Sequence, residues 1–154
     1  MTFVKVMARM TTYHDPVPIH LKAGTIDGKC LHVAYTRDLP VRWECPDIAV
    51  SAARAEEASR ILEIVLRHLH DKSLRLINAS QTIEIDGLPI LWSCPVSIFH
   101  LRQVLPDLVT ASRGTPPQAL EIQPLRSRPE PGTRPDIDAP GSIADLARDA
   151  APAG

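Results

Sequence analysis

One segment of this sequence, residues 51–72, has a pattern that is typical of an amphipathic helix. Apolar side chains recur at steps of three and four residues, while Glu and Arg side chains fall mainly on the other side. Ser51 is a suitable N-cap for it. The pattern covers about three heptads at most, which is too short for a coiled coil. It therefore predicts one long helix that packs its apolar stripe against another element. The stripe consists of Ala55, Ala58, Leu62, Val65 and Leu69.

Two Asp-Gly dipeptides mark turns between β-rich segments. Asp27-Gly28 stands between two such segments and favours a type I′ hairpin turn. Asp86-Gly87 predicts a second two-residue turn, and in its register four apolar residues share one buried face. These four are Ile83, Ile85, Leu88 and Ile90.

The order of the elements indicates the fold class. Further strands are predicted at residues 2–10 and 39–45, and a short helix at residues 95–105 that stops near Pro106. Strands, a long helix, strands and a short helix then follow one another. This order predicts an α+β domain: a two-layer sandwich with a largely antiparallel sheet packed against one long and one short helix.

The composition changes sharply near Gly114. Residues 114–154 hold eight of the 15 prolines and few aliphatic residues. Proline removes backbone donors, and so polar a segment buries too little apolar surface to offset its ordering entropy. We therefore expect a compact domain at residues 1–113 and a mostly disordered, proline-rich tail at residues 114–154.

The tail contains one short predicted helix, at residues 142–150. Ser142 and Asp145 have the spacing of an N-cap and an acidic N3 residue. Ile143, Leu146 and Ala147 form a narrow apolar stripe, but a helix of two turns is marginal in water. We hypothesise that these three residues bind a partner as a docking peptide on a flexible tether. The alternative is an inert terminus rich in alanine and proline.

Charge and cysteine usage restrict the partners and the compartment. A net charge of −1 provides no long-range field to attract nucleic acid. No apolar run approaches the length of about 20 residues that a spanning helix needs. Three cysteines, an odd number, fit a reducing compartment better than a disulfide framework. We expect a soluble cytoplasmic protein that does not engage a membrane.

The motif Trp-x-Cys-Pro occurs twice, at residues 43–46 and 92–95. Each copy is predicted to lie where a strand ends and a helical region begins, with proline forming the corner and cysteine turned inward. The alternative is a reactive or metal-bound thiol, because a cysteine near a helix N-terminus has a lowered pKa. Cys45 and Cys94 are thus the candidate thiols.

Cys30 and His32 are a second candidate pair. They alternate on a predicted strand and so share a face, which would supply half of a zinc site. However, a turn at Asp27-Gly28 places His20 on the opposite face of the hairpin. The register therefore argues against a joint site, and we expect no metal ion and no cofactor.

The functional prediction is a small cytoplasmic binding or adaptor protein, with regulation among its roles, that acts through contact with another protein or a second copy. No nucleotide-binding or hydrolase motif occurs, so an enzyme is the less favoured class. The first alternative is a small thiol- or metal-dependent enzyme or sensor that uses Cys45 or Cys94 with a histidine. The weaker alternative is a nucleic-acid accessory protein with a basic patch. That patch would consist of Arg67, Lys72, Arg75 and Arg102.

Overall fold

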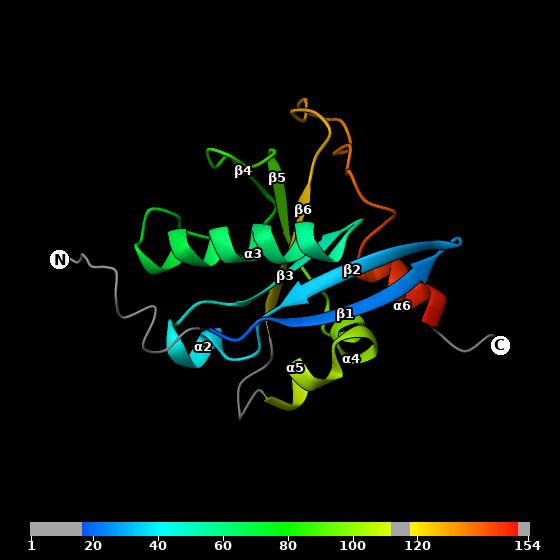
Figure 1. Ribbon diagram of the computed structural model, residues 1–154, viewed down its shortest axis with the longest axis horizontal. Helices are drawn as coiled ribbons and strands as arrows, with labels where there is room; N and C mark the ends of the chain where they lie inside the picture. Colours follow the sequence, from blue (N-terminus) through cyan, green and yellow to red (C-terminus); the bar gives the residue numbers. More distant parts are fainter. Residues whose placement is uncertain (1–16, 112–117, 151–154) are drawn as a thin grey trace.

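A computed structural model describes residues 17–111 and 118–150 of the chain, shown in Figure 1. The strands are β1 (His20–Ile26), β2 (Lys29–Tyr35), β3 (Asp47–Ala52), β4 (Gln81–Ile83), β5 (Leu91–Pro95) and β6 (Ala119–Pro124). The helices are α2 (Leu39–Arg42), α3 (Ala55–His70), α4 (Ile98–Val104), α5 (Pro106–Ala111) and α6 (Ile143–Ala150).

All six strands belong to one mixed sheet, in the order β1-β2-β3-β6-β5-β4. Only the central pair, β3 and β6, is parallel, and every other neighbouring pair is antiparallel. Every residue of β3 and of β6 is buried. Strands that are covered on both faces are buried in this way. The class α+β therefore stands, with a largely antiparallel sheet.

Helices cover both faces of the sheet, so the fold has three layers and not the predicted two. Figure 1 shows α3 on one side of the strands and α4, α5 and α6 on the other. Two apolar clusters fill the spaces between the layers. The first joins the sheet to α3 through Ala58, Ile61, Leu62, Val65 and Leu66. The second joins it to the other helices through Leu101, Val104, Leu108, Ile143, Leu146 and Ala147.

The predicted division into a domain at residues 1–113 and a mostly disordered tail at residues 114–154 needs correction. β6 lies within the supposed tail and forms the middle of the sheet, and α6 packs on the same domain. The reason is local. Ala119, Leu120 and Ile122 supply a short apolar run, which the many prolines around it conceal in any average over the whole segment.

The first hairpin forms as predicted. Asp27 has φ 50° and Gly28 has φ 78°, the two positive values that a type I′ turn requires. The second turn differs. Ile83 pairs with Leu91, one position away from the register of a two-residue turn, so Ile83 is buried while Ile90 is half-buried. A shift by one residue exchanges the faces of a strand, which is why Leu91 enters the core.

Two other elements also differ from the sequence predictions. The long helix begins at Ala55 with Arg54 as its N-cap, and Ser51 lies in β3, a strand that was not predicted. Residues 39–45, predicted as a strand, form α2 and the turn after it. The short helix is confirmed as α4, with Ser97 as its N-cap. The strand predicted at residues 2–10 lies outside the described residues.

The central position of β6 leads to a stability prediction. Ile122 is fully buried between β3 and β5, so Ile122→Ala should lower the free energy of unfolding by about 3 kcal/mol through lost burial and a residual cavity. Urea unfolding monitored by circular dichroism measures this loss. The control is Val41→Ala, at a side chain that is 86% exposed. If residues 114–154 were a tail outside the core, the two variants would instead show equally small losses in the free energy of unfolding.

Candidate functional site

β1 is an edge strand of the described sheet, and most of its residues are exposed. β1 ends the sheet and pairs only with β2 among the described strands. Ile26 and Lys29 close the hairpin as a hydrogen-bonded pair, and the direction of the backbone groups alternates from there. The N–H and C=O groups of Leu21, Ala23 and Thr25 therefore point away from the sheet.

The side chains of this edge divide between the two faces of the sheet. Leu21 and Ala23 pair with Ala34 and His32 of β2 and lie on the α3 side, where Leu21 is 57% exposed. Lys22 pairs with Val33, lies on the opposite side and is exposed. An incoming strand would thus meet apolar and small side chains on one face and a cation on the other.

A polar cluster stands at the start of β1. The Nε–H of Arg37 donates to Nε2 of His20 over 3.0 Å, and the hydroxyl of Tyr35 donates to Oδ2 of Asp107 over 2.7 Å. Nη1 of Arg37 lies 3.6 Å from the same carboxylate oxygen, and the rings of His20 and Tyr35 are 5.5 Å apart. Residues from β1, β2, the segment after β2 and α5 meet here.

The hydrogen-bonding roles follow from this geometry. Nε2 of His20 is the acceptor in its contact with Arg37, because a guanidinium N–H can only donate. Burial and the hydrogen bond to Asp107 raise the pKa of Tyr35 to about 12, so the phenol stays protonated at neutral pH. The cluster consequently combines one guanidinium with the Asp107 carboxylate, and the Tyr35 proton is already donated to that carboxylate. The donor that remains for an anion is the Nη2 group of Arg37, which has no acceptor among the described residues.

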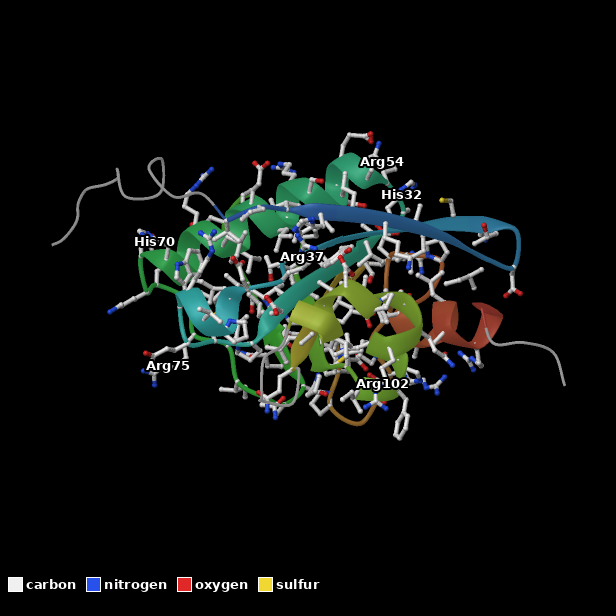
Figure 2. All side chains as sticks on the ribbon, turned by 90° about the horizontal axis from the view of Figure 1, so that it is seen from below. His32, Arg37, Arg54, His70, Arg75 and Arg102 are labelled. Atoms are coloured by element: carbon white, nitrogen blue, oxygen red, sulfur yellow. The ribbon has the colours of Figure 1, made fainter. Side chains whose placement is uncertain are left out.

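Further cations surround the edge. Within the described part of the chain, no carboxylate lies within ion-pair distance of Lys22, Lys29 or Arg54. Figure 2 shows Arg54 and Arg37 on the two sides of the β1–β2 hairpin. Lys22, Lys29 and Arg54 therefore place positive charge around the edge that no described carboxylate pairs with, whereas Arg37 is paired with Asp107.

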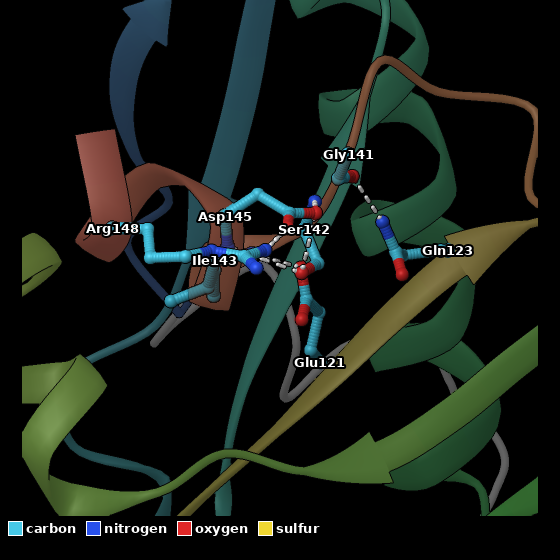
Figure 3. Close-up of polar contacts among 7 residues, drawn as sticks. All are labelled: Glu121, Gln123, Gly141, Ser142, Ile143, Asp145 and Arg148. Carbon is cyan, nitrogen blue, oxygen red and sulfur yellow. Dashed lines mark hydrogen bonds and ion pairs between the residues drawn. The ribbon is translucent and has the colours of Figure 1, made fainter. Parts of the chain in front are cut away.

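A buried carboxylate lies below the centre of the sheet. Glu121 of β6 is 4% exposed and accepts hydrogen bonds from Oγ of Ser51 at 2.5 Å and from the backbone N–H of Ile143 at 2.8 Å, as Figure 3 shows in part. Gln123, two residues along the strand, donates to the carbonyl of Gly141 over 2.6 Å. β6 thereby holds the start of α6 through two polar side chains.

Ser142 and Asp145 form the predicted cap of α6. The Asp145 carboxylate accepts from the backbone N–H of Ser142 over 2.9 Å, and the Ser142 hydroxyl accepts in return from the N–H of Asp145. Arg148 adds an ion pair to Asp145. These contacts, drawn in Figure 3, explain why so short a helix is formed in the folded protein.

The residues predicted to bind a partner pack against the domain itself. Ile143, Leu146 and Ala147 are 0%, 6% and 1% exposed and belong to the cluster under α4. Leu146 approaches Gly24 of β1 so closely that a Cβ there would lie 2.5 Å from its Cδ2 atom. The groove expected on a partner is thus present in the same chain, and in this conformation the three residues are unavailable to another protein.

The two candidate thiols are neither paired nor activated. Cys45 and Cys94 are free, half-buried cysteines, and Glu121 faces Cys94 across the β5–β6 pair. Burial, with a nearby carboxylate in each case, raises the pKa of both thiols to about 11. At neutral pH these cysteines are protonated and poor nucleophiles.

The two copies of Trp-x-Cys-Pro occupy different structural positions. Residues 92–95 lie in β5, which ends at Pro95 just before α4, so this copy is the predicted strand-to-helix joint. Residues 43–46 follow α2 and precede β3, which reverses the predicted order. Trp43 is the C-cap of α2, and its ring lies 5.5 Å from that of His70 of α3 at a tilt of 53°.

The metal and nucleic-acid candidates do not assemble. Cys30 is exposed on β2 beside the half-buried His32, and no three His, Cys, Asp or Glu side chains among residues 17–111 and 118–150 are arranged to hold a metal ion. Of the proposed basic patch, Arg67 lies on α3 whereas Arg102 lies on α4, across the sheet. Figure 2 likewise shows Arg75 and Arg102 well apart.

Sequence reasoning missed the residues that tie distant segments together. Arg37 and Asp107 meet only because α5 folds back under β2, and no spacing in the sequence signals that contact. Glu121 had a local signal, since Leu120 and Ile122 alternate with Glu121 and Gln123 as in a strand.

Comparisons with protein-family models, with curated proteins and with solved structures found no match. Within the described residues, no helix is both long enough and apolar enough to cross a lipid bilayer.

Glu121 predicts a specific dependence of stability on pH. Burial raises the pKa of its carboxyl from 4.5 to about 7, so the folded protein retains a proton that the unfolded chain releases. The stabilisation is complete below pH 4.5 and is lost as the pH rises through 7. Glu121→Gln should therefore flatten the decrease in the free energy of unfolding between pH 5 and pH 8, a difference on the order of 2–3 kcal/mol.

Urea titrations at pH 5, 6, 7 and 8 measure that decrease. The control is Glu63→Gln, at an exposed position of α3, which should leave it as in the wild type. If the free energy of unfolding decreases equally with pH in the wild type and in Glu121→Gln, Glu121 is not the cause of the decrease.

Thiol reactivity provides a second test. Raising a thiol pKa from 9.0 to about 11 lowers the thiolate fraction about a hundredfold at neutral pH. Iodoacetamide at pH 7.5 should therefore modify the exposed Cys30 rapidly and Cys45 and Cys94 only after denaturation, as mapped by mass spectrometry. Cys30→Ser should abolish the rapid phase. Rapid labelling of Cys45 or Cys94 would instead favour the thiol-enzyme alternative.

Proposed function

We propose that this protein is a small binding or adaptor protein that acts through protein–protein contact, and that it receives its partner along the outer edge of β1. The observation that carries the proposal is the row of outward-facing backbone groups at Leu21, Ala23 and Thr25. Addition of a strand to such an edge is a common mode of peptide recognition, in which the main chain provides affinity and side chains provide specificity. Unpaired edges otherwise invite aggregation.

The opposite edge of the sheet is a weaker candidate. β4 has only three residues, and Glu84, directly after it, forms a two-pronged ion pair with Arg128 at 2.7 and 2.8 Å. β1 is more than twice as long and has mostly exposed side chains. Length and access therefore both favour β1 as the edge that accepts a strand.

The rival functions have less support. The raised pKa values of Cys45 and Cys94 argue against thiol catalysis, and the basic residues proposed for nucleic acid are divided between two faces of the sheet. A cytoplasmic location belongs to the same proposal. The three free cysteines support it, because thiols persist in a reducing compartment.

A proline at position 23 tests the proposed edge. The N–H of Ala23 points outward, so Ala23→Pro removes a donor to the partner without removing a hydrogen bond between β1 and β2. Ala23→Val keeps the donor and serves as the matched control. The wild type and Ala23→Val, immobilised and exposed to cell extract, should retain the same stoichiometric protein, and Ala23→Pro should lose it at least tenfold.

Thermal unfolding shows whether the proline variant is folded. If Ala23→Pro melts within a few degrees of the wild type and still retains the partner, the β1 edge is not the binding site. Hydrogen exchange of the wild-type complex supplies an independent readout, because binding at the edge slows exchange at Leu21, Ala23 and Thr25.

A further inference from the structure

We propose that the segment bound by β1 is an acidic extended peptide, with carboxylate side chains at alternate positions on the α4–α6 side and small apolar side chains on the α3 side. This inference rests on the proposed function and adds the chemical class of the partner. It depends on which side chains of the edge would face an incoming strand.

The pairing geometry places the incoming side chains close to Lys22. Since Leu21 and Ala23 make the outward hydrogen bonds, Lys22 occupies the non-hydrogen-bonded position between them. In an antiparallel pair, side chains at such positions are the closer ones, with Cα atoms about 4.5 Å apart. A carboxylate opposite Lys22 would therefore lie within ion-pair distance of its ammonium group.

A second cation, Arg37, lies on the same face beside His20, which precedes Lys22 by two residues on β1. Arg37 reaches His20 through Nε and Asp107 through Nη1, and these contacts orient its guanidinium beside the start of β1. Within the described residues its Nη2 group has no acceptor. Acidic side chains opposite His20 and Lys22 would meet Arg37 and Lys22 in turn, which requires the two-residue spacing of a strand.

The α3 side of the edge imposes a different requirement. The edge presents three exposed side chains on this side: the apolar Leu21 and the small Ala23 and Thr25. Small apolar residues of the incoming strand would cover Leu21 and bury its surface. An alternation of acidic and small apolar residues follows from the two faces together.

Two other occupants fit the charge less well. In a symmetric pairing of two copies centred on Lys22, each lysine faces its own equivalent, and like charges directly opposite are destabilising. A symmetric pairing centred on Ala23 instead places Lys22 opposite Gly24, which offers no carboxylate. The segment at residues 2–10 of this chain carries Lys5 and Arg9 and no acid, so it would add positive charge to a positive edge.

Synthetic peptides test the proposal on the full chain. The probe is an acetylated, amidated octapeptide of alternating Val and Glu, and its matched counterpart alternates Val and Lys. We expect the Glu peptide to slow amide exchange at Leu21, Ala23 and Thr25, measured by NMR, and to bind at least tenfold more tightly than the Lys peptide. Added salt should weaken this binding, because the contacts are exposed.

Charge reversal assigns the preference to the edge. Lys22→Glu should weaken binding of the Glu peptide at least tenfold and improve binding of the Lys peptide. The control Arg102→Glu makes the same change of net charge on α4, away from β1, and should have little effect. Equal binding of the two peptides, or protection outside β1, would overturn the proposal.

The state of the free protein is also informative. Amides of β1 that already exchange slowly at every protein concentration would mean that the chain covers its own edge, and protection that grows with concentration would mean that a second copy does. Either result overturns the acidic peptide as occupant. A natural partner that is lost on Ala23→Pro but unaffected by Lys22→Glu would leave the proposed edge intact and refute only its acidic preference.

Discussion

The parallel pairing of β3 with β6 is the interaction on which the rest of the fold depends. It joins a strand from the first half of the sequence to one from near its end, and both strands are buried on both faces. Every other strand pairing extends outward from this pair. Because parallel neighbours need a long connection, the chain between them has room for α3, α4 and α5, which cover the two faces, and for β4 and β5, which extend the sheet.

Burial at this pair includes polar groups, and they are satisfied to different degrees. Ser51 on β3 donates a hydrogen bond to Oε2 of Glu121 on β6, and the same oxygen accepts from the backbone N–H of Ile143 at the start of α6. A helix N-terminus favours a negative group, which offsets part of the cost of burying it. Ser93 of β5 is different, since its buried hydroxyl has no hydrogen-bond partner in the described structure. Ser93→Ala should therefore cost little free energy of unfolding, because no hydrogen bond is lost.

The sequence predicts elements whose information is local. The hairpin at Asp27-Gly28, the amphipathic stripe of α3 and the cap at Ser142 depend on residues within a few positions of each other. β6 was missed because Glu121 and Gln123 read as exposed polar residues. Hydrogen bonds to residues distant in the sequence offset the free-energy cost of burying these two side chains, and such partners cannot be inferred from spacing. The one-residue register difference at Ile83 has the same origin, since the core and not the turn decides it.

The candidate site was predictable to a similar extent. Pairing across the hairpin places His20 beside Tyr35, and the turn alone predicts it. Arg37 and Asp107 could not be added, because their contact depends on how α5 folds back. The docking role of Ile143 and Leu146 stays a prediction, although both side chains pack on the same chain here. An apolar stripe specifies that something covers it, but not which molecule does.

The interior carboxylate and the exposed edge are physically connected through α6. Glu121 holds the first residue of that helix, and one turn later Leu146 fills the space that Gly24 leaves under β1. Any side chain at position 24 would force Leu146 or the strand to move, since its Cβ would lie well inside contact distance. The shape of the β1 edge is therefore supported from beneath by the C-terminal segment. A change in the ionisation of Glu121 acts first on the anchor of α6, and through the contact of Leu146 with Gly24 it reaches β1.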